Sequence, residues 1–201
     1  MRSILVYATA SVAALVTATA GLAGQPVTQT LVPQPPLFET CKALGSGTLC
    51  EGSIASSYGP IDTGLACGSG SGAFDIFDSA SESEVARRVY DASGRLVRRD
   101  RHDRYDGQLS NPAAGTPLPY TQVQEITDEL AVPGDLSSAT TTITGQMHIR
   151  ASTGAPVVIG AGRLIFAPDG SVEFQAGPSG FLDLIFGEPV AVDPICAALG
   201  G

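Results

Sequence analysis

Lysine and asparagine are almost absent from this chain, and charged residues of every kind make up only 15% of it. Lysine occurs once, as Lys42, and there are two methionines, whereas glycine and proline number 24 and 14. Stable helices need runs of good helix formers, which glycine and proline interrupt. Short strands joined by many turns therefore explain the composition better than helices do.

Motifs for common catalytic and cofactor sites are also missing. There is no Gly-x-Ser-x-Gly sequence for a nucleophilic serine, and the glycine- and serine-rich run 68–72 has no lysine to bind a phosphate. His102 and Asp103 are adjacent, and adjacent strand residues point to opposite faces, so Asp103 is badly placed to orient the imidazole. The sequence identifies no catalytic residue and no cofactor, and it leaves open whether the protein is an enzyme.

Basic residues are outnumbered by acidic ones, 11 to 20, which gives a net charge of -9. Binding to nucleic acid or to an anionic membrane surface requires a basic footprint that neutralises phosphates. We therefore expect neither as a partner.

The first 24 residues have the pattern of a secretory signal peptide: Arg2 at the start, a mostly apolar run over 4–16, and small residues after it. Cleavage after Ala20 or Ala23 fits, and we expect Ala23. An uncleaved membrane anchor is the alternative, because about 20 apolar residues cross a bilayer. We predict a secreted protein that is not inserted in a membrane after cleavage. The expected parts are a signal peptide (1–23), a loosely held, Pro-rich extended segment (24–40) and a single domain (41–201).

All four cysteines lie in the exported part, and an even number in an oxidising compartment favours two disulfides. Three pairings are possible, and we expect Cys41 with Cys50 and Cys67 with Cys196. A metal site is the alternative, but the cysteines lack closely spaced ligand pairs and lie far from both histidines. We therefore expect no metal.

The pattern of apolar residues and turns predicts about eight strands in one antiparallel meander, closed into a β-barrel or divided into a two-sheet sandwich. The first long strand is expected at 65–77, after a glycine- and serine-rich stretch. A hairpin is expected over 84–100 with its turn at 91–94, and a second such turn at 167–170. The only predicted helix is a short turn over 193–199, with Asp193 as its cap and Pro194 at its first position.

Seven arginines lie between residues 87 and 104, on the predicted hairpin. Either of two registers brings two arginines together, Arg87 opposite Arg98 or Arg87 opposite Arg99. Opposed like charges need a carboxylate from a third strand or a bound anion. Cross-strand ion pairs on a solvated hairpin are the simpler interpretation. The candidate ligand-binding residues are Arg87, Arg98, Arg99, His102 and His148.

Five stretches, residues 88–98, 109–112, 161–164, 168–170 and 196–199, together resemble a set of small secreted bacterial proteins of uncharacterised function. The resemblance covers most of the chain from about residue 66 onward. Its motifs are turn and strand patterns, so it implies a compact β-barrel and carries over no catalytic residue.

The leading hypothesis is a monomeric, secreted β-barrel that binds either a small apolar molecule in its interior or a partner on the Arg-rich hairpin. A barrel of about eight strands is filled by side chains or holds one small ligand. An enzyme that isomerises or cyclises a lipid-like substrate is the second hypothesis, and it needs His102, His148 or Glu125 to point into a cavity. A structural cell-surface protein is the third, and it predicts no cavity.

Overall fold

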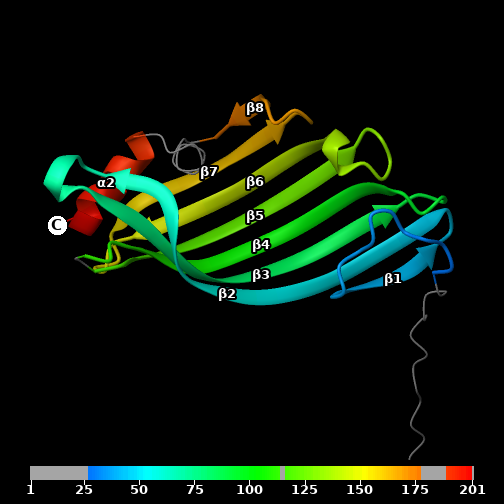
Figure 1. The fold of residues 1–201 in the computed structure, drawn as a ribbon, viewed down its shortest axis with the longest axis horizontal. Helices are drawn as coiled ribbons and strands as arrows, with labels where there is room; N and C mark the ends of the chain where they lie inside the picture. Colours follow the sequence, from blue (N-terminus) through cyan, green and yellow to red (C-terminus); the bar gives the residue numbers. More distant parts are fainter. Residues whose placement is uncertain (1–26, 114–115, 178–188, 201) are drawn as a thin grey trace, which may run out of the picture.

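The computed structural model describes residues 27–113, 116–177 and 189–200. The predicted signal peptide and residues 24–26 lie outside the described residues. The described chain forms one antiparallel sheet in which each strand pairs with the next along the sequence (Figure 1). Its elements are β1 (Glu39–Leu44), β2 (Gly47–Cys67), the 3-10 turn η1 (Gly70–Gly72), β3 (Phe74–Tyr90), β4 (Leu96–Ser110), β5 (Leu118–Leu130), the 3-10 turn η2 (Leu136–Ser138), β6 (Ala139–Arg150), β7 (Pro156–Phe166), β8 (Val172–Ala176) and the helix α2 (Pro189–Gly200).

The prediction of an all-β protein with eight antiparallel strands and a C-terminal helix is confirmed. β1 and β8 end the strand order and do not pair with each other, so the described sheet is not closed into a barrel. Figure 1 shows a strongly bent sheet with α2 at one end of it. We call the face of the sheet on which α2 packs the inner face, and the opposite face the outer face.

The predicted strand at 65–77 is wrong, because the chain reverses direction inside it. β2 ends at Cys67, η1 follows, and β3 begins at Phe74. Gly68 and Gly70 have φ of +72° and +69°, a conformation that favours glycine and that turns the chain. The glycine- and serine-rich residues before Cys67 form most of β2, and the long exposed stretches of this strand include the apolar side chains Ile54 and Ile61.

The predicted hairpin and its turn are confirmed, as β3, β4 and the residues between them. The Asp91 carboxylate accepts hydrogen bonds from the backbone N–H groups of Arg95 and Ser93, which lowers the pKa of Asp91. The second predicted turn connects β7 to β8 in the same way, with Asp169 accepting from Ser171.

Both predicted registers of the hairpin are wrong. A bulge beside Tyr90 shifts the pairing, so that Arg87 lies opposite Asp100 and Arg88 lies opposite Arg99. Arg87 therefore meets a carboxylate on the outer face. The two opposed arginines are Arg88 and Arg99, and they lie on the inner face.

The Pro-rich segment is held more firmly than predicted, over the residues of it that the structure describes. Leu31 is buried, and Val32 exchanges backbone hydrogen bonds with Gly94 and Leu96. The Tyr90 hydroxyl donates to the carbonyl of Pro33 at 2.9 Å. These contacts fasten the segment to the β3–β4 turn.

α2 begins four residues earlier than the predicted helical turn. Pro189, not Pro194, takes the first position, and Pro194 lies inside the helix, so the predicted cap at Asp193 is wrong. A proline at the first helical position loses no hydrogen bond, because that N–H has no partner within the helix.

Two apolar clusters lie at opposite ends of the inner face. The larger joins α2 to the sheet and includes Ile76, Leu109, Ile149, Ile195 and Leu199. The smaller contains Leu31, Cys50, Tyr90, Leu96 and Leu130. The disulfide Cys67–Cys196 ties β2 to α2, and Cys41–Cys50 joins β1 to β2, which are the two pairs that we expected.

Candidate functional site

Polar side chains occupy the middle of the inner face, between the two apolar clusters. Side chains alternate between the two faces of a strand. Ile76 of β3, Leu109 of β4 and Tyr120 of β5 lie on the inner face, and so do the residues of the same strand that are an even number of positions away. We call this set the polar band; its members are Glu82, Glu84, Arg88, Arg99, Arg101, Asp103, Tyr105, Gln122, Gln124 and Asp128.

Asp128 organises one half of the polar band. The Arg99 guanidinium donates to Asp128 at 2.7 Å, Thr141 donates to its other oxygen at 2.7 Å, and Arg101 lies 3.9 Å away. Arg88 does not share this carboxylate and donates to Glu39 of β1 at 2.8 Å. Each of the two opposed arginines therefore has its own carboxylate, which relieves the repulsion between them.

Asp103 lies at the centre of the polar band and is only 2% exposed. Its Oδ2 accepts from Gln124 at 3.2 Å, and its Oδ1 has no hydrogen-bond partner among the described residues. Glu84 lies directly opposite on β3. Burial of Glu84, and secondarily the charge of Asp103, raises the pKa of Glu84.

A cavity of about 240 Å³ lies between the polar band and the α2 end of the sheet. Leu65, Leu109 and Met147 form its apolar wall. Its polar lining comes from Thr63, Asp78, Tyr120 and Gln122. The volume is below the range of about 300–1,000 Å³ that is typical of drug-sized ligands, so the cavity suits a small molecule.

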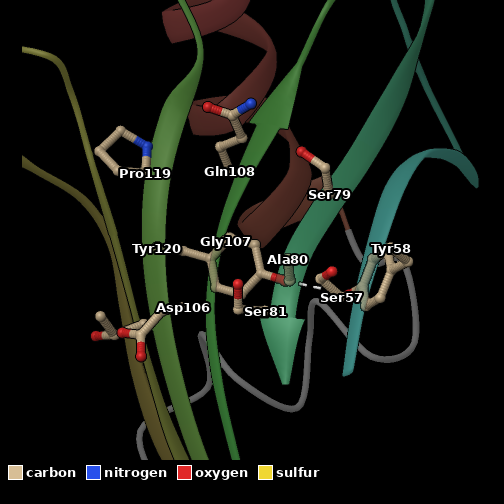
Figure 2. Close-up of a pocket in the computed structure, with 11 residues that line it drawn as sticks. Ser57, Tyr58, Ser79, Ala80, Ser81, Asp106, Gly107, Gln108, Pro119 and Tyr120 are labelled. Atoms are coloured by element: carbon tan, nitrogen blue, oxygen red, sulfur yellow. Dashed lines mark hydrogen bonds between the residues drawn. The ribbon is translucent and has the colours of Figure 1, made fainter. Parts of the chain in front are cut away.

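Two tyrosines aim their hydroxyls at Asp78. Tyr58 donates at 2.7 Å and Tyr120 at 3.0 Å. Burial raises the pKa of both tyrosines, and the charge of Asp78 raises it further, so both remain protonated donors at neutral pH. Figure 2 shows the Tyr120 ring crossing Gly107 toward Tyr58.

A second hollow, of about 300 Å³, lies at the opposite end of the polar band. Arg99, Asp128 and Thr141 line it beside Phe166 and the β7–β8 turn. Arg99 is the one predicted ligand-binding residue that lines an inner-face hollow. Its guanidinium is already paired with Asp128, as described above.

The other four predicted ligand-binding residues lie on the outer face. Arg87 faces Glu51 at 3.6 Å, Arg98 contacts Asp100 at 2.9 Å, and His102 is hydrogen-bonded to Glu125. His148 lies between Thr121 and Ile159 of the neighbouring strands, away from His102. The structure therefore does not bring the five candidates together. His102, His148 and Glu125 do not line the inner cavity.

The outer face is also hollowed, over β2 to β5, where small side chains prevail. This open hollow has a volume of about 570 Å³. Figure 2 shows Ser57, Ser79, Ser81 and Gln108 among the residues that line it. It is broad and open to solvent. The inner cavity is the more enclosed of the two, which favours it as a ligand site.

Sequence reasoning missed Asp78, Tyr58 and Tyr120. The signal that points to Asp78 is its spacing: it lies two residues from both Ile76 and Ala80, on the side of the strand that alternation assigns to the core. A carboxylate at a predicted core position needs partners or a function.

Over the ranges 27–113, 116–177 and 189–200, no three histidine, cysteine, aspartate or glutamate side chains gather as metal ligands. Within those same ranges no helix is long and apolar enough to cross a membrane. No family model, curated protein or solved structure matches the chain.

Proposed function

We propose that this is a secreted binding protein that takes one small, mostly apolar ligand in the cavity at the α2 end of the inner face. The observation that carries the proposal is the lining of that cavity. Its apolar wall suits the body of a ligand, and Asp78, Tyr120 and Gln122 offer hydrogen bonds to a polar end.

Secretion is part of the proposal. The two disulfides indicate an oxidising, non-cytoplasmic environment. The pattern of residues 1–23 supports export through a signal peptide.

Binding is favoured over catalysis by the placement of the histidines. An isomerase or cyclase of the kind considered above needs His102, His148 or Glu125 in a cavity, and all three lie on the outer face. A purely structural role predicts no cavity, which makes it the weakest of the three hypotheses.

The Arg-rich hairpin supports a macromolecular partner less well than the cavity supports a small ligand. Arg87, Arg98 and Arg104 on its outer face each lie beside a carboxylate: Glu51, Asp100 and Asp106. Surface guanidinium groups that are already paired attract a further anion weakly.

A cavity-filling substitution tests the proposal. Met147→Phe adds volume to the wall, and Ile159→Phe on the neighbouring strand is the matched control, because Ile159 is 58% exposed on the outer face. Thermal-shift screening of the wild type against small apolar compounds with one polar group should find ligands. At about 100 times Kd these should raise Tm by about 5–10 °C.

The same compounds should bind to Ile159→Phe as to the wild type and should lose at least about tenfold in affinity for Met147→Phe. Equal binding to Met147→Phe and the wild type, or no compound that shifts the wild type, contradicts the proposal.

A further inference from the structure

Among the described residues, Asp78 is the only carboxylate in the lining of the inner cavity, and it is half-buried. Its partners are the neutral hydroxyls of Tyr58 and Tyr120. No lysine, arginine or histidine of the described residues forms an ion pair with it. The cavity therefore contains a carboxylate that has no cationic side chain paired with it among the described residues.

This environment differs from that of the buried carboxylates Glu39 and Asp128, and it resembles that of Asp103, which has no ion pair among the described residues but does not line the cavity. Glu39 is paired with Arg88, and Asp128 with Arg99. A partly buried charge is costly unless an opposite charge or several hydrogen bonds compensate it. Asp78 is thus an inner-face carboxylate without an ion pair among the described residues that a ligand in the cavity can reach.

The Asp78 carboxylate also has acceptor capacity to spare. An ionised carboxylate offers about four lone-pair positions. Two hydroxyl donors occupy part of that capacity, with Tyr120 contacting both oxygens at 3.0 and 3.2 Å. A ligand donor in the cavity has room to bind the same carboxylate.

The rest of the lining suits an organic cation rather than a metal ion. Leu65, Leu109 and Met147 provide an apolar wall, and no cluster of metal ligands exists among the described residues. Tyr120 lines the same space, and cations are attracted to the faces of aromatic rings. The net charge of -9 raises the local concentration of cations at the protein.

We propose that the ligand of the inner cavity is a small primary amine with an apolar body, whose ammonium group binds to the Asp78 carboxylate. The proposal rests on the proposed binding function and names the class of ligand. The amine lies against Leu65, Leu109 and Met147, and its ammonium group donates to Asp78 between Tyr120 and Gln122.

Two amines and their neutral counterparts test this assignment by isothermal titration calorimetry at neutral pH. The pairs are 2-phenylethylamine with 2-phenylethanol, and cyclohexylmethylamine with cyclohexylmethanol. In each pair the apolar body is the same and only the charged group differs. The wild type should bind at least one amine about tenfold or more tightly than its alcohol, because hydrogen bonds between charged groups are the stronger ones.

Asp78→Asn should abolish that preference while the alcohol keeps its wild-type affinity, and Asp106→Asn on the outer face should behave as the wild type. If Asp78→Asn does not fold, Asp78→Ser removes the same charge with a smaller side chain. A preference for the amine that persists without the carboxylate overturns the assignment.

The two proposals fail in different ways. Alcohols that bind as tightly as amines overturn the amine assignment and leave the binding function in place. If neither series binds to the wild type, the amine assignment is wrong, and the screening outcome above decides the binding function.

Discussion

At the scale of single residues, some of the buried charges of the inner face are held in ion pairs. Glu39 and Arg88 are the clearest case, with side chains 0% and 10% exposed. A buried pair contributes little net stability, but removal of one partner leaves the other charge buried and alone.

We therefore predict that Glu39→Gln or Arg88→Met lowers the free energy of unfolding by about 3–5 kcal/mol. The double variant Glu39→Leu with Arg88→Met should recover most of that loss, because no unpaired charge remains. Urea denaturation measures both effects. The exposed pair Arg104–Asp106 is the control, and its disruption should cost at most about 1 kcal/mol. Equal effects at the two pairs would contradict this account.

Glu84 is a residue whose charge destabilises the fold. Its pKa is raised in the folded protein, so between its ordinary value of 4.5 and the raised value the folded state binds more protons than the unfolded state. Stability therefore falls as pH rises through that range. Glu84→Gln removes this penalty, and because the site is half-solvated we expect a gain below about 1 kcal/mol.

The corresponding rise in Tm at pH 7 is about 1–3 °C, and it should shrink as pH falls toward 4.5. Scanning calorimetry over this pH range measures it. Glu173→Gln on the exposed strand β8 is the control and should change little at any pH. A gain that is constant with pH would show that the Glu84 charge is not its cause.

At the scale of elements, the two disulfides differ in the length of chain that they close. Cys67–Cys196 spans 129 residues and holds α2 on the sheet, whereas Cys41–Cys50 spans 9. In the chain-entropy model their loss costs about 4–5 and about 2–3 kcal/mol respectively.

Replacing Cys67 and Cys196 together by serine should therefore lower stability more than replacing Cys41 and Cys50. Loss of Cys67–Cys196 should also free α2 from β2, so that the helix unfolds locally more often. Hydrogen exchange of the α2 amides distinguishes the two variants. Faster exchange in α2 after loss of Cys41–Cys50 alone is the contrary result.

The contact of Tyr120 with β4 depends on the glycine beneath it. A Cβ at Gly107 would lie 2.6 Å from the Tyr120 ring, so the ring must shift and its hydrogen bond to Asp78 must stretch. We expect Gly107→Ala to cost about 1–3 kcal/mol and to weaken ligand binding. Gly59→Ala, where a Cβ meets no atom within 4 Å, is the control. Chemical denaturation and the ligand titrations above measure both effects, and equal stability of the two variants would contradict the account.

The turns between strands were well predicted from the sequence, whereas the register of the strands that they join was not. The turns at 91–94 and 167–170 were predictable because aspartate, proline and glycine favour turns through local preferences, and the structure adds that Asp91 and Asp169 accept backbone hydrogen bonds there. The register beyond the first turn was not predictable, because one bulge beside Tyr90 moves every later pair.

At the scale of the whole molecule, the polar band was hidden from sequence reasoning for a physical reason. The middle of β4 is polar on both faces: Arg99, Arg101 and Asp103 point inward, and residues 98, 100 and 102 point outward. Alternation gives no signal there, so the hairpin resembles a solvated surface. The two faces of β4 become different only when the sheet bends and one of them becomes part of the inner face.

The cavity is likewise a property of the assembled sheet. Its lining comes from β2, β3, β4, β5 and β6, and no short stretch of sequence contains it. Its apolar members were predictable as core residues from their periodicity. These residues leave the space beside Asp78 unfilled, and this depends on how the strands and α2 pack together.

The most direct test of the cavity as a ligand site uses Met147, since the sequence contains only one other methionine, Met1. Selective labelling with ¹³C-methyl methionine places a single reporter in the cavity wall. Titration with 2-phenylethylamine should shift the Met147 methyl signal saturably, and the Asp78→Asn variant should require a markedly higher concentration for the same shift. A Met147 signal that stays unmoved while calorimetry shows saturable binding would place the ligand elsewhere and contradict the account.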